Sequence, residues 1–445
     1  MFMQFRETIS RSGEGLRIMI LPYGEALIHP YYQEGIAGLA NLPNVLGISC
    51  QTNLSFNVKQ FVSVLPSEVI GKIKLWASFH PEMVSVDNFV KKAHYLFDNG
   101  IELCVGVVGH PENKEIIREL REELRADIYL FINSMRGIAH RLKTEDISFF
   151  TSIDNLFGYD RKQVKADIQK CKGGRETIFI DESGNWYACP RSGVKMTDQP
   201  VCKRKVCDCY IAYSNNNSVI QDIMGNGFIW RIPQKQKVSA MFFDIDGTLT
   251  DSQGAIPDSY IKSLKWFSSK IPLFLATALP LSFAKRKLGS SMKLFSGGVF
   301  ADGAHLLSGK EEEYIALTPP DLNRNFKISA YRNKIGETYK LALTAKSEQT
   351  AQSLYNKLKD NYNAYLEGKL LTITDKKADK QKGVLAICKK RDINLSQVMV
   401  MGDTLRDWPM MSVAGYSCAV LDSCDELKSK AKMVLNPNQL TFWFC

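Results

Sequence analysis

The sequence has 445 residues, of which 45% are hydrophobic and 23% are charged, as is ordinary for a globular chain of two or three domains. The formal net charge of +10 favours anionic ligands, but Lys and Arg are scattered and form no basic stripe interleaved with aromatic residues, as a nucleic-acid surface would have. No signal peptide and no run of about 18 apolar residues is recognisable, so we expect neither export nor a membrane partner. We therefore expect a cytoplasmic protein that binds a phosphorylated small molecule.

Short apolar runs alternate with amphipathic stretches between Leu16 and about Gly137. This alternation is typical of the strands and helices of a parallel sheet, so it predicts an α/β fold. The runs that we interpret as strands are RIMIL, NVLGISCQTN, KIKLWASF, ELCVGVVGHP and IYLFINSMRG.

Gly24 and Glu25 follow the first of these runs, and Thr52 and Asn53 end the second. A carboxylate beside a backbone carbonyl at a strand end suits an ammonium group. The wider sequence, from YGEALIHP through ISCQTNLS to SFHPEMVSVDNFV and VGVVGHPEN, resembles radical S-adenosylmethionine enzymes over about 130 residues. The resemblance implies an incomplete (β/α) barrel over residues 1–160, in which Gly24 and Glu25 hold the amine of S-adenosylmethionine.

This region lacks the CxxxCxxC loop with which that family binds its catalytic iron-sulfur cluster. Residues 1–15 resemble the end of the family's first helix, so the missing strand and loop would lie upstream of Met1, in a longer chain or in a separate partner protein. We therefore expect a truncated or split radical enzyme, or a relic of one. Reductive cleavage of S-adenosylmethionine by this chain alone is not expected.

The segment 161–213 loses the βα rhythm and fills with Cys, Gly, Lys and Arg. Thiolates gathered in a short segment suit zinc or an iron-sulfur cluster, because few apolar residues are present to support a fold without metal. Cys171, Gly184 and Cys189 have the spacing CX12GX4C, which resembles the twitch or SPASM auxiliary modules of radical S-adenosylmethionine enzymes. That resemblance implies a 4Fe-4S cluster rather than zinc. The candidate ligands, of which four would be used, are Cys171, Cys189, Cys202, Cys207 and Cys209.

Residues 214–237 are polar and turn-rich and then basic, which predicts a linker. A second βα series occupies residues 238–445, with VSAMFFDIDGTLT, PLFLATALP, QVMVMGDT and YSCAVLDS as its strand regions. Between about residues 308 and 375 the pattern changes, because YKLALTAK and AYLEGKLLTIT flank the helical run SEQTAQSLYNKLKDN. We expect a small α+β insert there.

Asp244 and Asp246 follow the apolar run AMFF, and because side chains alternate along a strand, the two carboxylates can face one site. Gly247 permits a sharp turn after them, and Thr248 offers a hydroxyl group. Displacement of a phosphate ester needs a nucleophile, a proton donor and positive charge beside the phosphoryl oxygens. Two carboxylates at the carboxyl edge of a parallel sheet can supply the first two.

Further polar residues follow strands and a helix start in the same series. Thr277 ends the second strand, where its hydroxyl could hold a phosphoryl oxygen, and Lys382 precedes Gly383 at a predicted helix start, a good place for a cation directed at phosphate. The strand VMVM runs into Asp403 and Asp407, whose carboxylates suit a hard divalent cation. A DxDGT sequence alone could be an ordinary turn, but four such elements in order favour a catalytic site.

DIDGTLT, the Thr of LATALP, the Lys of QKG and GDTLRD resemble, in this order, the four motifs of the haloacid dehalogenase superfamily. The resemblance covers residues 238–445 and implies a Rossmann-like domain that hydrolyses phosphate monoesters. Asp244 would attack phosphorus to form an aspartyl-phosphate, and Asp246 would protonate the leaving alcohol and then activate water. Thr277 and Lys382 would stabilise the transferred phosphoryl group.

Magnesium is the cofactor that this resemblance implies. It would be held by the carboxylates of Asp244 and Asp403 and by the backbone carbonyl of Asp246, with Asp407 assisting directly or through water. The insert between the second and third motifs resembles the cap of Cof-like sugar-phosphate and cofactor phosphatases, and caps select substrates. Many of those relatives have ATGR where this chain has ATALP, so the loop after Thr277 departs from the family pattern.

Three functions follow as alternatives. The first is a magnesium-dependent phosphatase for a small metabolite. The second is the iron-sulfur and S-adenosylmethionine-binding part of a split radical enzyme with an appended phosphatase, and the third is a non-catalytic binding module in the Cys-rich half.

Overall fold

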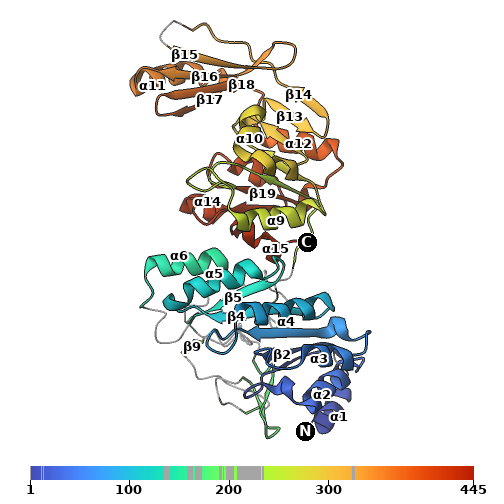
Figure 1. The fold of residues 1–445 in the computed structure, drawn as a ribbon. Helices are drawn as coiled ribbons and strands as arrows, with labels where there is room; N and C mark the ends of the chain where they lie inside the picture. The colour runs from blue at the N-terminus through green and yellow to red at the C-terminus, as the bar shows by residue number, and fades with distance from the viewer. Residues whose placement is uncertain are drawn as a thin grey trace. The chain divides into compact units, whose positions relative to one another are not determined.

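The computed structural model describes residues 2–11, 13, 15–134, 141–157, 164–165, 173–189, 193, 195–196, 205–207, 232, 235–322 and 326–445. The chain divides into two compact units, Met1–Lys235 and Gln236–Cys445. Within the described ranges, no helix is both long enough and apolar enough to cross a membrane. Both units are α/β structures, as the alternation of apolar and amphipathic segments predicts (Figure 1).

The N-terminal unit is built on five parallel strands whose order in the sheet is their order in the sequence. The second and fourth strands are buried along most of their length, which explains their nearly continuous apolar sequences, whereas buried and partly exposed residues alternate along the third. The parallel pairing confirms the predicted βα series. The strands are β1 (Leu16–Ile20), β2 (Val45–Thr52), β3 (Ile73–Ser78), β4 (Glu102–Val108) and β5 (Tyr129–Asn133).

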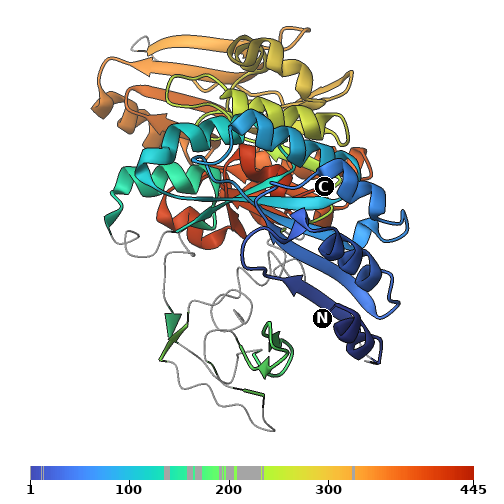
Figure 2. The same cartoon turned by 60° about the horizontal axis from the view of Figure 1, so that its bottom comes forward.

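Helices connect these strands and pack side by side in sequence order, from the second helix to the fifth (Figures 1 and 2). Such a row follows from right-handed crossovers between neighbouring parallel strands, which place each helix on the same face of the sheet. The helices are α1 (Phe2–Ser10), α2 (Pro30–Ala40), α3 (Val58–Val64), α4 (Val86–Asp98), α5 (Lys114–Glu123) and α6 (Thr144–Ile153).

Helix α4 shows why these segments are helical. Its buried residues recur at helical spacing, at Val86, Phe89, Val90, Ala93 and Leu96. Ser85 caps its start, because the side-chain oxygen accepts a hydrogen bond from the Asn88 amide at 3.4 Å. The apolar face packs into a core that contains Leu75, Val105 and Leu130.

The segment predicted to be a Cys-rich module contains two short antiparallel strand pairs. One pairs β6 (Val164–Lys165) with β9 (Val206–Cys207), and the other pairs β7 (Phe179–Ile180) with β8 (Trp186–Tyr187). Much of the rest of this segment lies outside the described residues.

The C-terminal unit has an eight-stranded sheet in the order β14-β13-β12-β11-β10-β19-β20-β21. The strands from β12 to β21 are parallel, and β13 and β14 add an antiparallel hairpin at one edge. All residues of β10 are fully buried, because this strand lies between two others and under helices on both faces. The strands are β10 (Ala240–Phe243), β11 (Leu273–Ala276), β12 (Gly297–Phe300), β13 (His305–Ser308), β14 (Glu311–Tyr314), β19 (Val398–Gly402), β20 (Tyr416–Ala419) and β21 (Met433–Val434).

The helices of this core include two that bear on the site below, α10 and α12. In chain order they are α9 (Asp258–Ser268), α10 (Leu281–Leu288), α12 (Lys380–Lys390), α13 (Trp408–Ser412), α14 (Asp425–Lys430) and α15 (Leu440–Trp443). This arrangement is the Rossmann-like core that the sequence predicts.

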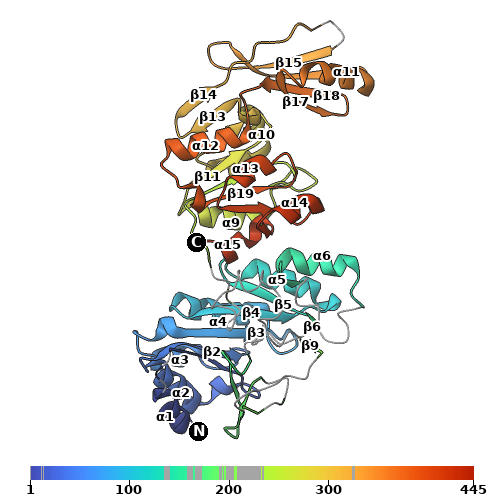
Figure 3. The same ribbon diagram turned by 180° about the vertical axis from the view of Figure 1, so that it is seen from behind.

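The insert forms a second, antiparallel sheet in the order β15-β16-β18-β17, which we call the cap. Helix α11 (Glu348–Leu358) packs along this sheet, and Figure 3 shows it from behind. The core of the cap is formed by Leu341, Leu343 and Ile373. An α+β insert is therefore present as predicted, but it begins later than about residue 308, because β14 (Glu311–Tyr314) belongs to the core sheet. The strands are β15 (Phe326–Arg332), β16 (Thr338–Ala345), β17 (Tyr362–Glu367) and β18 (Leu370–Asp375).

Candidate active site

The carboxyl ends of three neighbouring parallel strands bring the predicted residues of the C-terminal unit together. Asp244 follows β10, Thr277 follows β11, and Asp403 follows β19. Strand β10 pairs directly with both neighbours, so the residues after these strands meet at one edge of the sheet.

Asp244 is buried and shares a lysine with a second carboxylate. The ammonium group of Lys380 donates to Oδ1 of Asp244 at 2.7 Å and to Oδ1 of Asp407 at 2.8 Å. Burial, together with the negative charges of Asp407 and Asp403, raises the pKa of Asp244 to about 8, although Lys380 acts in the opposite direction. Burial lowers the pKa of Lys380, but the charges of Asp244 and Asp407 outweigh it and raise that pKa above its usual value. The pKa values of Asp244 and Lys380 are both raised for the same reason, because three carboxylates surround a single ammonium group here.

Asp403 completes this cluster from the neighbouring strand. Burial and the charge of Asp407 raise the pKa of Asp403 to about 6, while the hydroxyl of Thr248 donates to Oδ1 of Asp403 at 3.1 Å. Gly247 allows this close approach, because it has a φ of +76° and a Cβ at this position would lie 2.3 Å from Oδ2 of Asp403. The DxDGT turn therefore needs glycine for both its backbone conformation and its contact with Asp403.

The three carboxylates could hold a metal ion. Asp244, Asp403 and Asp407 each offer an oxygen, and the three oxygens lie within 4.8 Å of one another. Carboxylate oxygens are the ligands that Mg²⁺ and other hard divalent cations prefer, and such a cation would offset the mutual repulsion that raises the carboxyl pKa values. The donor set therefore fits the predicted magnesium.

Asp246 lies beside this cluster but is turned toward solvent. Its side chain is 51% exposed and forms an ion pair with Lys287 of α10. A half-exposed carboxylate next to a buried one is suitably placed to exchange protons with a ligand and with water.

Thr277 is 1% exposed, and its hydroxyl oxygen accepts a hydrogen bond from the Leu279 amide at 3.1 Å. A hydroxyl that accepts through its oxygen still has its own proton to donate. The arrangement thus leaves the Thr277 hydroxyl able to donate to a phosphoryl oxygen.

The lysine of the site is Lys380, and the prediction of Lys382 needs correction. The side chain of Lys382 is exposed. Its backbone amide donates a hydrogen bond to the side chain of Asp379, which caps the start of α12. Lys380 is the first residue of that helix and faces the strand ends, whereas two residues further on a helix side chain points about 200° away around the axis. The sequence does contain a signal for this helix start. Asp379 is a typical N-cap residue, and an N-cap at this position makes Lys380 the first residue of the helix.

A second charged cluster, which the sequence analysis missed, joins the cap to the core. Lys340 of β16 donates to Asp302 at 3.0 Å and to the carbonyl of Ala278 at 2.6 Å. Arg406, between the two aspartates of GDTLRD, also pairs with Asp302 and lies 3.3 Å from the ring centroid of Tyr365 in β17. Burial raises the pKa of Asp302, but Lys340 and Arg406 outweigh it and lower that pKa below its usual value. We call these four residues, Asp302, Lys340, Tyr365 and Arg406, the cap-core cluster.

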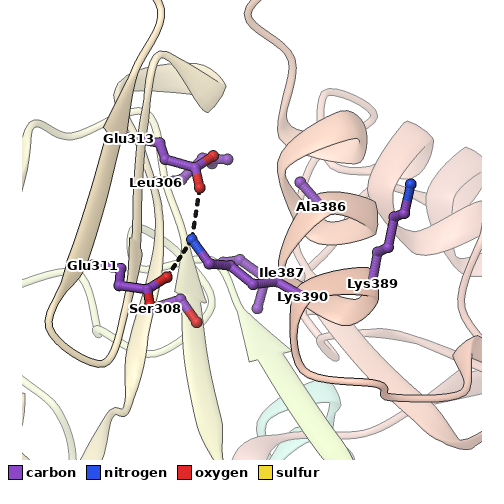
Figure 4. Close-up of a pocket in the computed structure, with 8 residues that line it drawn as sticks. All are labelled: Leu306, Ser308, Glu311, Glu313, Ala386, Ile387, Lys389 and Lys390. Atoms are coloured by element: carbon purple, nitrogen blue, oxygen red, sulfur yellow. Dashed lines mark hydrogen bonds and ion pairs between the residues drawn. The ribbon is translucent and has the colours of Figure 1, made fainter.

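A separate pocket of about 400 Å³ lies between α12 and the β13-β14 hairpin (Figure 4). Its Lys390 bridges Glu311 at 2.5 Å and Glu313 at 2.6 Å, so this lysine is already paired with two carboxylates. Lys390 is ten residues after Lys380 on the same helix, which corresponds to about 15 Å along the axis. This pocket is therefore distinct from the cluster around Asp244.

In the N-terminal unit, Gly24 has a φ of +75° and Glu25 lies at the carboxyl edge of the sheet. The Glu25 carboxylate accepts hydrogen bonds from the Thr52 hydroxyl at 2.8 Å and from the amides of Leu27 at 3.2 Å and Asn53 at 2.5 Å. The structure thus brings together the strand-end residues that the sequence analysis selected here.

The predicted cysteine ligands fall mostly outside what the structure describes. Cys171, Cys202 and Cys209 are not among the described residues, and of Cys207 only the backbone is described. Cys189 is half-buried after β8. The predicted cluster stays a prediction.

The C-terminal unit is similar to known proteins. Residues 308–440 match the family model of haloacid dehalogenase-like hydrolases. The phosphoglycolate phosphatase of Archaeoglobus fulgidus is 27% identical over 210 residues, which cover 44% of this chain and 90% of that protein. That of Methanopyrus kandleri is 23% identical over 218 residues, again 44% of this chain and 90% of that protein. Among solved structures, a haloacid dehalogenase-like hydrolase from Bacteroides thetaiotaomicron is 17% identical, with 45% of this chain and 96% of that chain covered and a TM-score of 0.39.

The family match falls on the part of the chain that contributes Lys380, Asp403 and Asp407 to the carboxylate cluster. The C-terminal unit of this chain is therefore a haloacid dehalogenase-like hydrolase domain.

Proposed function

We propose that the C-terminal unit hydrolyses phosphate monoesters of small metabolites with Mg²⁺ as its cofactor. The observation that carries this proposal is the buried Lys380 between Asp244 and Asp407, with Asp403 within metal-binding distance of both. The names of the relatives from Archaeoglobus fulgidus and Methanopyrus kandleri support a phosphatase and put phosphoglycolate among the substrates to test.

In the first step, a carboxylate oxygen of Asp244 attacks phosphorus and the bond between phosphorus and the ester oxygen breaks. Asp246, in its protonated form, donates its proton to the departing alkoxide, which leaves as the alcohol. The product is an aspartyl-phosphate on Asp244. In the second step, the Asp246 carboxylate takes a proton from water as the water oxygen attacks phosphorus, which releases inorganic phosphate and restores Asp244.

The neighbouring residues hold the reacting groups in place. The Thr277 hydroxyl donates to a phosphoryl oxygen, and Lys380 fixes the orientation of the Asp244 carboxylate through its 2.7 Å hydrogen bond. A bound Mg²⁺ supplies positive charge that offsets the carboxylates and the phosphoryl oxygens. Asp244, Asp403 and Asp407 are the side chains that would hold it.

The test is magnesium-dependent phosphate release from a panel that includes phosphoglycolate, sugar phosphates and a generic aryl phosphate. We expect release by the wild type, loss of release with a chelator, and loss in Asp244→Asn. Circular dichroism of the variant checks that it is folded. Absence of release from every substrate, or full activity of Asp244→Asn, would contradict the proposal.

A second candidate function concerns the N-terminal unit. The convergence of Glu25 with Thr52 and Asn53 at the sheet edge favours a ligand with an ammonium group, and the sequence resemblance makes S-adenosylmethionine the ligand to test. Equilibrium dialysis of the full chain with S-adenosylmethionine should show binding that Glu25→Gln weakens. Iron and zinc analysis of the same protein distinguishes a 4Fe-4S cluster from zinc at the cysteines. Absence of binding by the wild type would overturn this candidate.

A further inference from the structure

A second pocket lies beside Asp246, on the side of the core that carries α10. It has a volume of about 250 Å³ and is lined by Leu279, Phe283, Arg286 and Lys287. Lys287 forms the ion pair with Asp246, and the Leu279 amide donates to the Thr277 hydroxyl. Two of its four lining residues therefore contact residues of the phosphoryl-transfer site directly.

The pocket combines two cations with an apolar floor. Arg286 is exposed and lies over the ring of Phe283, with 4.5 Å between Cζ and the ring centroid, a cation-π contact that favours this position of the guanidinium. In the described part of the chain, no carboxylate forms an ion pair with Arg286, whereas Lys287 forms an ion pair with Asp246. A guanidinium that has planar donors and no paired acid is suited to a carboxylate or a phosphate.

One cap residue lies next to this pocket, although all four lining residues belong to the core. The ring of Phe283 contacts the ring of Tyr331 in β15 edge-on, with 5.7 Å between centroids. The pocket thus lies near the junction of core and cap and is open to solvent, so that a part of the substrate other than its phosphoryl group can reach it.

We infer that this pocket binds a second anionic group, a carboxylate or a further phosphate, on the alcohol part of the substrate, and that Arg286 and Lys287 select for it. The inference rests on the proposed phosphatase function. Its geometry limits the substrate, because the leaving oxygen forms a hydrogen bond with Asp246 and Asp246 pairs with Lys287, so the leaving oxygen and the Lys287 ammonium are separated by one carboxylate group. The second anionic group must then be only a few bonds from the ester oxygen.

The experiment compares kcat/KM for closely matched esters with the full chain and Mg²⁺. Phosphoglycolate supplies a carboxylate, ethane-1,2-diol bisphosphate supplies a second phosphate, and the neutral amide of phosphoglycolate supplies neither. We expect the wild type to prefer at least one of the anionic esters to the amide by about tenfold or more, because a charge-assisted hydrogen bond contributes that much. The preferred anionic ester identifies the source of the charge.

Variants on α10 then test the residues. Arg286→Gln should reduce the preference for the anionic ester about tenfold, mainly through KM, and Lys285→Gln is the matched control, since Lys285 has the same charge on the same helix outside the pocket. An unchanged preference in Arg286→Gln, or equal hydrolysis of the amide and the anionic esters by the wild type, would overturn the inference while the phosphatase proposal stands. Failure to hydrolyse even an aryl phosphate would contradict the phosphatase proposal itself and the inference with it.

Discussion

The two units each present at least one carboxylate at the carboxyl edge of a parallel sheet, but the groups that surround the carboxylates differ. In the C-terminal unit, Asp244, Asp403 and Asp407 crowd around one ammonium group, and the pKa values of Asp244 and Asp403 rise as a result. In the N-terminal unit, the single carboxylate of Glu25 is surrounded by neutral donors. Position at a sheet edge is therefore common to both, whereas forced proximity of like charges distinguishes the C-terminal edge, where we propose that a cation and a phosphoryl group bind.

The largest expected effect distinguishes two lysines that are two residues apart. Lys380→Gln removes the cation between Asp244 and Asp407 and should lower kcat by about a thousandfold, because it misplaces the nucleophile and leaves the carboxylates unbalanced. Lys382→Gln is the matched control and should change kcat less than about twofold, since its side chain is exposed. Steady-state kinetics on one good substrate checks both. Equal losses in the two variants would contradict the placement of Lys380.

The next effect concerns the cap-core cluster. Asp302→Asn should lower the free energy of unfolding of the C-terminal unit by about 3 kcal/mol, because it leaves the buried Lys340 without its counter-ion. Glu313→Gln removes an exposed partner of Lys390 and should cause no measurable change. Urea unfolding of the full chain measures both. An Asp302→Asn variant as stable as the wild type would show that the cluster contributes nothing to holding the cap.

A smaller effect follows from the raised carboxyl pKa values. Asp403, with a pKa of about 6, and Asp244, with a pKa of about 8, bind protons more tightly in the folded chain than in the unfolded chain. In the absence of metal, stability should therefore fall as pH rises from about 4 to about 8, and most of the fall should come from the more deeply buried Asp244.

Mg²⁺ should reverse this loss, so its stabilising effect in urea unfolding should be larger at pH 8 than at pH 5. Metal binding displaces protons from carboxylates, which is why affinity should increase with pH across this window. Equal stabilisation at both pH values would contradict the assignment of Asp244 and Asp403 as ligands.

The smallest expected effect is that of a substitution at Glu25, which tests the difference between the two sheet edges in the N-terminal unit. Glu25→Gln keeps an oxygen that can accept from the Thr52 hydroxyl and the Asn53 amide, so the free energy of unfolding should change by only about 1 kcal/mol. Its unfolding should also show no new dependence on Mg²⁺. A magnesium effect on this variant that differs from the magnesium effect on the wild type would break the distinction between the two sheet edges.

A feature of the site could be predicted from the sequence when it depends on the residues that are close to it along the chain. The convergence of Asp244, Thr277 and Asp403 was predictable because each directly follows an apolar strand, and parallel strands end at one edge. The choice between Lys380 and Lys382 depended on where a helix begins, a boundary that apolar periodicity locates only within a few residues.

The cap-core cluster could not be predicted in this way. Asp302 and Lys340 are separated by 38 residues and Asp302 and Arg406 by 104, and they meet only because the cap sheet packs on the core. The same is true of Arg286, whose role depends on a pocket that forms between α10 and the loop after Thr277. Contacts of this kind follow from tertiary packing rather than from spacing along the chain.

The most direct test of the central claim is to look for the covalent intermediate on Asp244. The full chain, as wild type and as Asp246→Asn to slow the second step, is mixed with Mg²⁺ and a hydrolysed monoester, quenched in acid and analysed by peptide mass spectrometry. The account predicts a phosphoryl group on the peptide that contains Asp244, and its loss in the Asp244→Asn variant. Phosphate release by Asp244→Asn at the wild-type rate, with any phosphoryl group found on another residue, would contradict it.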